Sequence, residues 1–82
     1  MRRVTLYTRP GCHLCDQVRE AIIAMRPELP AFELHEVDIE GDDGLLARYL
    51  ERIPVVAVDG EIVSELVLDR DLLRVRLDTV RP

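Results

Sequence analysis

Residues 3–15 read RVTLYTRPGCHLC, and this stretch carries most of the fold prediction. Its β-branched and aromatic first half predicts a strand, and the turn residues Arg9-Pro10-Gly11 end that strand. A helix is predicted over residues 12–25, and Pro27 and Pro30 stop it. Its expected buried stripe has helical spacing and consists of Leu14, Val18, Ile22 and Met25. Two cysteines therefore lie at the start of a helix that follows a strand.

The rest of the chain alternates predicted strands and helices between turn residues. In order, we expect a strand at 32–39, a turn at 40–44 that caps a helix, a stop at Pro54, strands at 55–58 and 61–66, and a helix from near Asp69. The pair Asp59-Gly60 predicts a tight hairpin between the last two strands. The apolar residues expected on the two later helices are Leu46, Tyr49, Leu50 and Ile53, then Leu72, Leu73, Leu77 and Val80.

The predicted order of elements is β-α-β-α-β-β-α, which is an α/β arrangement. Because a helix joins the first two strands, we expect them to be parallel with a right-handed crossover. The last two strands form a hairpin, so we expect them to be antiparallel. The prediction is a four-stranded mixed sheet covered by three helices. The chain has 82 residues and no repeat or linker, so we interpret residues 1–82 as a single domain.

The net charge of −5 argues against a nucleic-acid-binding surface, which needs a clustered basic face. No apolar run reaches the ~20 residues needed to cross a bilayer. Arg2-Arg3 is followed by an apolar stretch too short for an export signal. The sequence therefore predicts a cytoplasmic protein that binds neither nucleic acid nor membranes, and we expect a monomer.

The two cysteines of the chain, Cys12 and Cys15, are three residues apart, a spacing that favours reactivity or metal binding over a structural staple. Cys12 is predicted at the helix N-cap, where free N–H groups and the helix dipole stabilise an anion and lower a thiol pKa. Cys15 lies one turn later on the same face, with its Cα ~5–6 Å from that of Cys12, so the two can form a disulfide. We expect Cys15 to be the more buried thiol. Cys12 would then attack a target disulfide, and Cys15 would resolve the mixed disulfide.

A zinc site is the main alternative for such a cysteine pair, because Cys-x-x-Cys also begins many zinc sites. A tetrahedral site needs two further ligands. The candidates are His13, inside the motif, and His35, in the middle of a predicted strand. Neither arrangement is typical of zinc sites, so we favour redox chemistry, predict no metal ligand, and leave inert buried thiols as the remaining reading.

Residues 6–15 resemble the active-site segment of glutaredoxins and related small redoxins. The segment Ile53-Pro54-Val55 resembles the part of that family that holds a cis-proline opposite the cysteines. The pair Asp59-Gly60 matches the hairpin that follows. The resemblance covers essentially the whole chain and implies a thioredoxin fold.

The resemblance also implies roles for the matching positions. Cys12 would be the nucleophile and Cys15 the resolving thiol. Pro54 would follow a cis peptide bond, and the backbone of Ile53 would pair with an extended substrate. Arg9 would receive a carboxylate of glutathione.

The chain departs from many glutaredoxins in two places. It has His13 and Leu14 between the cysteines, and a protonated His13 beside the thiolate would stabilise it and make the disulfide more oxidising. The other reading, a solvated first-turn residue, stays open, and Asp16 acts on the thiolate in the opposite direction. Many glutaredoxins also have a Gly-Gly pair that helps hold glutathione after the last strand, whereas residues 64–69 read SELVLD. We therefore place the chain in a glutaredoxin-like branch without that glutathione motif.

The predicted function is that of a dithiol–disulfide oxidoreductase that reduces protein or glutathione mixed disulfides. No tightly bound cofactor is expected; glutathione is a candidate co-substrate, and glutathione or a reductase would supply the electrons. The alternative is a binding module whose cysteines hold a metal or an iron–sulfur cluster that bridges two subunits.

Overall fold

The computed structural model describes residues 1–78 of the chain. Its four strands are β1 (Arg2–Thr8), β2 (Phe32–Asp38), β3 (Val55–Val58) and β4 (Glu61–Glu65). Its three α-helices are α1 (His13–Ala24), α2 (Asp43–Tyr49) and α3 (Arg70–Asp78). Two short 3₁₀ turns lie at Arg26–Glu28 and Ile39–Gly41. The predicted order of strands and α-helices is confirmed, and most element ends differ by one or two residues. The exception is α2, which ends at Tyr49, so the expected place of Ile53 on this helix is wrong. Ile53 lies in the turn before Pro54.

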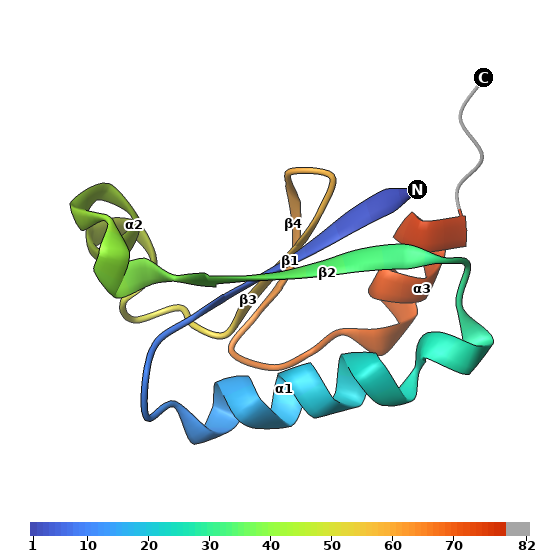
Figure 1. The fold of residues 1–82 in the computed structure, drawn as a ribbon, viewed down its shortest axis with the longest axis horizontal. Helices are drawn as coiled ribbons and strands as arrows, with labels where there is room; N and C mark the ends of the chain where they lie inside the picture. Colours follow the sequence, from blue (N-terminus) through green and yellow to red (C-terminus); the bar gives the residue numbers. More distant parts are fainter. Residues whose placement is uncertain (79–82) are drawn as a thin grey trace.

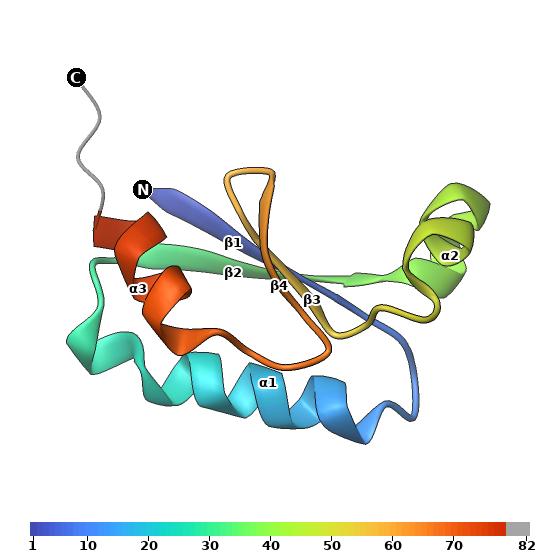
Figure 2. The same ribbon diagram turned by 180° about the vertical axis from the view of Figure 1, so that it is seen from behind.

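The four strands form one mixed sheet in the order β2-β1-β3-β4. β1 pairs with β2 in parallel, and both β1–β3 and β3–β4 are antiparallel. Helices α1 and α3 lie on one side of the sheet, while α2 lies on the other side, beyond the carboxyl end of β2 (Figures 1 and 2). The α/β fold class with a four-stranded mixed sheet is therefore confirmed.

The larger core lies between the sheet and the pair α1 and α3. It forms because each of these elements turns an apolar face inward, at helical spacing in α1 and on alternate residues in β1. Its buried members on β1, α1 and α3 are Val4, Leu6, Val18, Ile22, Leu73 and Leu77. This core holds α1 in place, and the start of α1 carries the cysteine pair.

The expected burial of Leu14 is wrong, because its side chain is 52% exposed. The buried stripe of α1 begins instead at Cys15 and continues through Val18 and Ile22. Leu14 precedes that stripe by one residue, or about 100° of helix rotation, and lies instead beside the loop that joins β4 to α3. The predicted final helix is confirmed up to Asp78, and Val80 lies outside the described residues.

A smaller apolar cluster lies on the α2 side of the sheet, next to the cysteines. Its buried members are Cys15, Ile39, Tyr49, Ile53 and Val55. Tyr7 packs against this cluster, with its ring centroid 4.7 Å from that of Tyr49. The ring of Tyr7 therefore contributes to packing next to the cysteines.

The predicted Asp59-Gly60 hairpin is present between β3 and β4. Both residues have positive φ, 49° at Asp59 and 89° at Gly60, as two-residue hairpin turns of the primed type require. Asp59 also accepts a hydrogen bond from the backbone N–H of Arg3 at 2.9 Å. The turn is thereby tied to the start of β1.

We expect Gly60→Ala to lower the free energy of unfolding by about 1–2 kcal/mol, because an added Cβ disfavours this positive φ. An added Cβ would meet no atom within 4 Å, so the loss is one of backbone conformation. Gly41→Ala is the matched control, since its Cβ also meets nothing and its φ is not in the left-handed region. Thermal unfolding should show a lower midpoint for Gly60→Ala alone. Equal midpoints for the two variants would contradict the assigned turn.

Candidate active site at the start of helix α1

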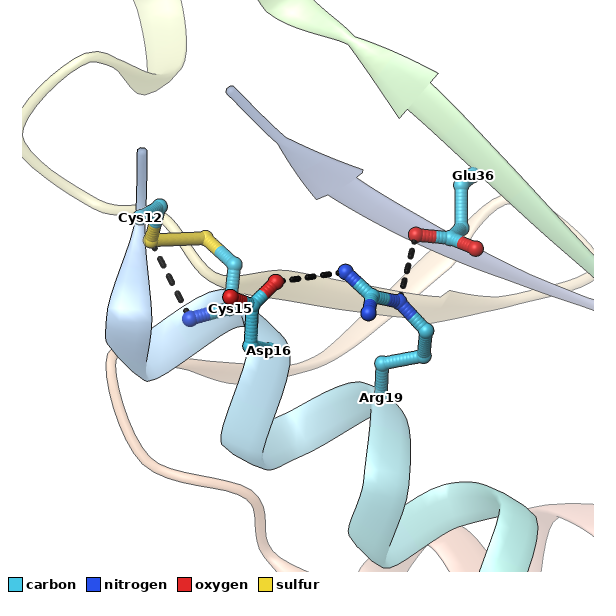
Figure 3. Close-up of a disulfide and its surroundings, with 5 residues drawn as sticks. All are labelled: Cys12, Cys15, Asp16, Arg19 and Glu36. Atoms are coloured by element: carbon cyan, nitrogen blue, oxygen red, sulfur yellow. Dashed lines mark hydrogen bonds and ion pairs between the residues drawn. A yellow bond between two sulfur atoms is a disulfide. The ribbon is translucent and has the colours of Figure 1, made fainter. Parts of the chain in front are cut away.

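Cys12 is the N-cap of α1. Its backbone is extended, with φ −87° and ψ 103°, so it lies just outside the helix. Its Sγ accepts a hydrogen bond from the backbone N–H of Cys15 at 3.1 Å (Figure 3). The sulfur thus occupies the position where a helix N-terminus stabilises negative charge.

Cys15 lies one turn into α1 and is fully buried. Its sulfur is bonded to that of Cys12 in a disulfide, and the two Cα atoms are 5.2 Å apart. The predicted separation and the predicted burial of Cys15 are both confirmed. A molecule that approaches from solvent meets the half-buried Cys12 first, because Cys15 is buried in a cluster with Ile39, Tyr49, Ile53 and Val55.

The segment Ile53-Pro54 is brought to the same place from a distant part of the chain. Ile53 belongs to the apolar cluster that contains Cys15. Cys12 packs against this cluster. Pro54 is fully buried, and the peptide bond between the two residues is cis. The N–H of Ile53 donates to the carbonyl of Tyr49 at 3.0 Å. Any backbone pairing of Ile53 with a substrate would therefore use its carbonyl oxygen.

Arg9 and His13 lie on either side of Cys12 in sequence, at the rim of the site. Arg9 forms an ion pair with Glu40, with 2.6 Å between Nη2 and Oε2. The Arg9 side chain is thus already paired with one carboxylate of the chain. His13 is exposed and makes no side-chain hydrogen bond within residues 1–78.

Sequence reasoning missed an ion-pair chain beside the cysteines. Arg19 contacts Asp16 at 2.6 Å and Glu36 of β2 at 2.8 Å (Figure 3). The hydrogen bond with Glu36 raises the pKa of Arg19 above its ordinary value. The Asp16–Arg19 pair could have been expected from its i,i+3 spacing, but Glu36 joins through the fold alone. The Asp16 charge near the helix start is thus partly neutralised by Arg19.

His35, considered above as a metal ligand, lies on β2 and contacts Glu33 at 2.9 Å. The hydrogen bond from His35 lowers the pKa of the Glu33 carboxyl group. Across the described residues, no group of three or more His, Cys, Asp or Glu side chains is arranged to hold a metal ion. No helix within residues 1–78 is long and apolar enough to span a membrane.

The mixed four-stranded sheet, its three helices and a Cys-x-x-Cys pair at the start of the first helix define a protein of the thioredoxin-like fold. A solved thioredoxin-like protein, BC3987, superposes on the chain with a TM-score of 0.61 at 24% identity, covering 95% of this chain and all of that one. The sequence matches the Glutaredoxin-like domain (DUF836) over residues 3–78. The chain belongs to this glutaredoxin-like family, as the sequence motifs predicted.

Relatives of known sequence and structure agree with this membership. An uncharacterized protein of Mycobacterium tuberculosis, Rv0508, is 35% identical over 77 residues, covering 88% of this chain and 78% of the relative. The solution structure of protein Ne2328 from Nitrosomonas europaea is similar with a TM-score of 0.84 at 28% identity, over 94% of this chain and 92% of that one. The X-ray structure of XcR50 from X. campestris is 37% identical with a TM-score of 0.72, over 95% and 99% of the two chains. The names of these three relatives state no activity.

Proposed function

We propose that the protein is a dithiol–disulfide oxidoreductase in which Cys12 is the nucleophile and Cys15 the resolving thiol. The observation that supports this most is the unequal placement of the two sulfurs. Cys12 Sγ lies at the helix N-cap and is partly accessible, while Cys15 is fully buried and bonded to it. Only one sulfur can therefore meet a substrate, and the other is positioned to react with the first.

The proposed reaction has two exchange steps. The Cys12 thiolate attacks one sulfur of the substrate disulfide, the S–S bond breaks, and the departing sulfur leaves as a thiolate that takes a proton from water. Cys15 then loses its proton to water and attacks Cys12 Sγ. The mixed disulfide breaks, and the second substrate sulfur leaves as a thiolate that takes a proton from water. The substrate gains two electrons, and the Cys12–Cys15 pair loses them.

The substrates of the proposed reaction are protein disulfides or glutathione mixed disulfides, and glutathione or a reductase returns the electrons. Both electrons come from the thiols themselves, so the reaction needs no resident cofactor. The carbonyl of Ile53, beside Pro54, would bind the substrate backbone next to Cys12. Arg9 and His13 would meet the substrate at the rim. We propose that the reaction takes place in the cytoplasm, where thiols are kept reduced.

Alkylation of the reduced protein tests the proposed roles of the two thiols. A short pulse of iodoacetamide at pH 7, followed by peptide mass mapping, should modify Cys12 and leave Cys15 largely unmodified, because Cys15 is buried. The same pulse in denaturant is the control and should modify both. Equal labelling of the two cysteines in the folded protein would contradict the proposal.

A further inference from the structure

A groove of about 190 Å³ lies between α1 and the loop that joins β4 to α3. Figure 2 shows this loop running alongside α1, on the side of the sheet that α1 and α3 share. Its lining is mostly apolar and includes Leu14, Ala21, Leu66, Val67 and Leu68, with Arg70 also in the lining. Leu14 stands between the two cysteines in sequence, so one lining residue of the groove is the chain neighbour of Cys15, although neither cysteine lines the groove.

Three apolar side chains in this lining are exposed rather than buried. Leu14 is 52%, Leu66 49% and Val67 77% exposed. Folding gains little from apolar groups that stay in water, and contiguous exposed apolar surface marks interaction sites. The placement of all three beside one groove is therefore best explained by contact with another molecule.

The loop is fixed in a conformation that is unusual for its residue. Leu66 has φ +67°, in the left-handed region that a branched residue rarely adopts. Its N–H donates to the carbonyls of Pro54 at 2.9 Å and Arg52 at 3.1 Å, so the loop is anchored to the Ile53-Pro54 segment. Glycine would adopt this backbone more readily, yet the chain places a half-exposed leucine here.

The pairing of its arginine distinguishes this groove from a second hollow, which Gly11 and Asp16 help to line. That hollow contains Arg9 and Arg19, and both are paired with carboxylates of the chain. Arg70 has no ion pair within the described residues. The groove therefore offers an apolar surface together with a guanidinium that can pair with a carboxylate from outside.

We infer that this groove binds an extended segment of a protein substrate, with apolar residues next to its disulfide cysteine and an acidic residue that pairs with Arg70. The inference rests on the proposed function and names its substrate class. Glutathione has no apolar side chain to fill the groove, and the chain has no Gly-Gly pair beside it. Protein disulfides in apolar, acidic segments are thus the favoured substrates.

Two chromogenic peptide disulfides test the inference, each with its cysteine joined to thionitrobenzoate. One peptide carries leucine, valine and aspartate around the cysteine, and the other carries serine and asparagine. The reduced wild-type protein should react with the apolar acidic peptide with a second-order rate constant about tenfold larger. Leu66→Gly suits the backbone at this position and should remove most of that preference, as should Val67→Ser. In the wild type, the contribution of the peptide's aspartate to this preference should fall with added salt. Arg70→Gln should remove that contribution.

Ile23→Ser is the matched control, because Ile23 is 46% exposed on α1 but does not line the groove. It should leave the preference unchanged. Equal rates for the two peptides, or a preference that survives Leu66→Gly and Val67→Ser, would overturn the docking inference alone. A faster reaction with glutathione mixed disulfide than with the apolar peptide would also overturn it. A wild-type protein that reacts with none of these disulfides would instead contradict the proposed function.

Discussion

Replacement of Cys12 by serine should lower the rate of disulfide reduction by at least about a hundredfold, because it removes the attacking sulfur. Serine is a strong N-cap residue, so its hydroxyl can accept the N–H of Cys15 as the sulfur of Cys12 does. The start of α1 should therefore survive the change. Dithiothreitol-driven reduction of insulin, followed by turbidity, measures the rate against a reaction without protein.

The companion variant Cys15→Ser separates the two roles in the same assay. It keeps the attacking sulfur but lacks the thiol that resolves the mixed disulfide, so turnover should fall while one equivalent of protein still reacts. Circular dichroism should show both variants folded. A Cys12→Ser protein with wild-type turnover would contradict the assignment of the nucleophile.

Leu73→Ala should destabilise the fold by about 3 kcal/mol, because Leu73 is fully buried in the core between the sheet and α3. In a domain of this size, such a loss should lower the thermal midpoint by more than about 10 °C. Leu50→Ala is the matched control, since Leu50 is 44% exposed at the end of α2. Thermal unfolding by circular dichroism checks both. Equal midpoints for the two alanine variants would show that the α3 core is wrongly described.

The fold could be predicted well because its local signals agree with one another. Pro-Gly after a β-branched run, Asp59-Gly60 between two apolar strands, and Asp42 or Asp69 at helix starts each have a physical reason that needs no tertiary context. Asp42 accepts the N–H of Leu45, and Asp69 that of Leu72, as N-cap aspartates do. Burial was harder to predict: Leu14 has the spacing of a core residue, yet it is 52% exposed in the first turn of α1.

The chemistry of the candidate site was predicted in part for the same reason. Cys12 and Cys15 are near neighbours, so helix geometry alone fixes their separation. Two ion pairs join residues far apart in sequence, Arg9 with Glu40 and Arg19 with Glu36. The second pair forms only because α1 packs near β2. The positive φ of Leu66 was likewise invisible, because leucine is not a residue that signals a left-handed turn.

The central claim is that Cys12 alone forms the bond with a substrate. Cys15→Ser, reduced and then mixed with a thionitrobenzoate peptide disulfide, should form a stable mixed disulfide, and mass mapping should locate the peptide on Cys12. Cys12→Ser, treated identically while folded, should bind no peptide, because Cys15 is fully buried. A peptide bound to Cys15, or no mixed disulfide on either variant, would contradict the account.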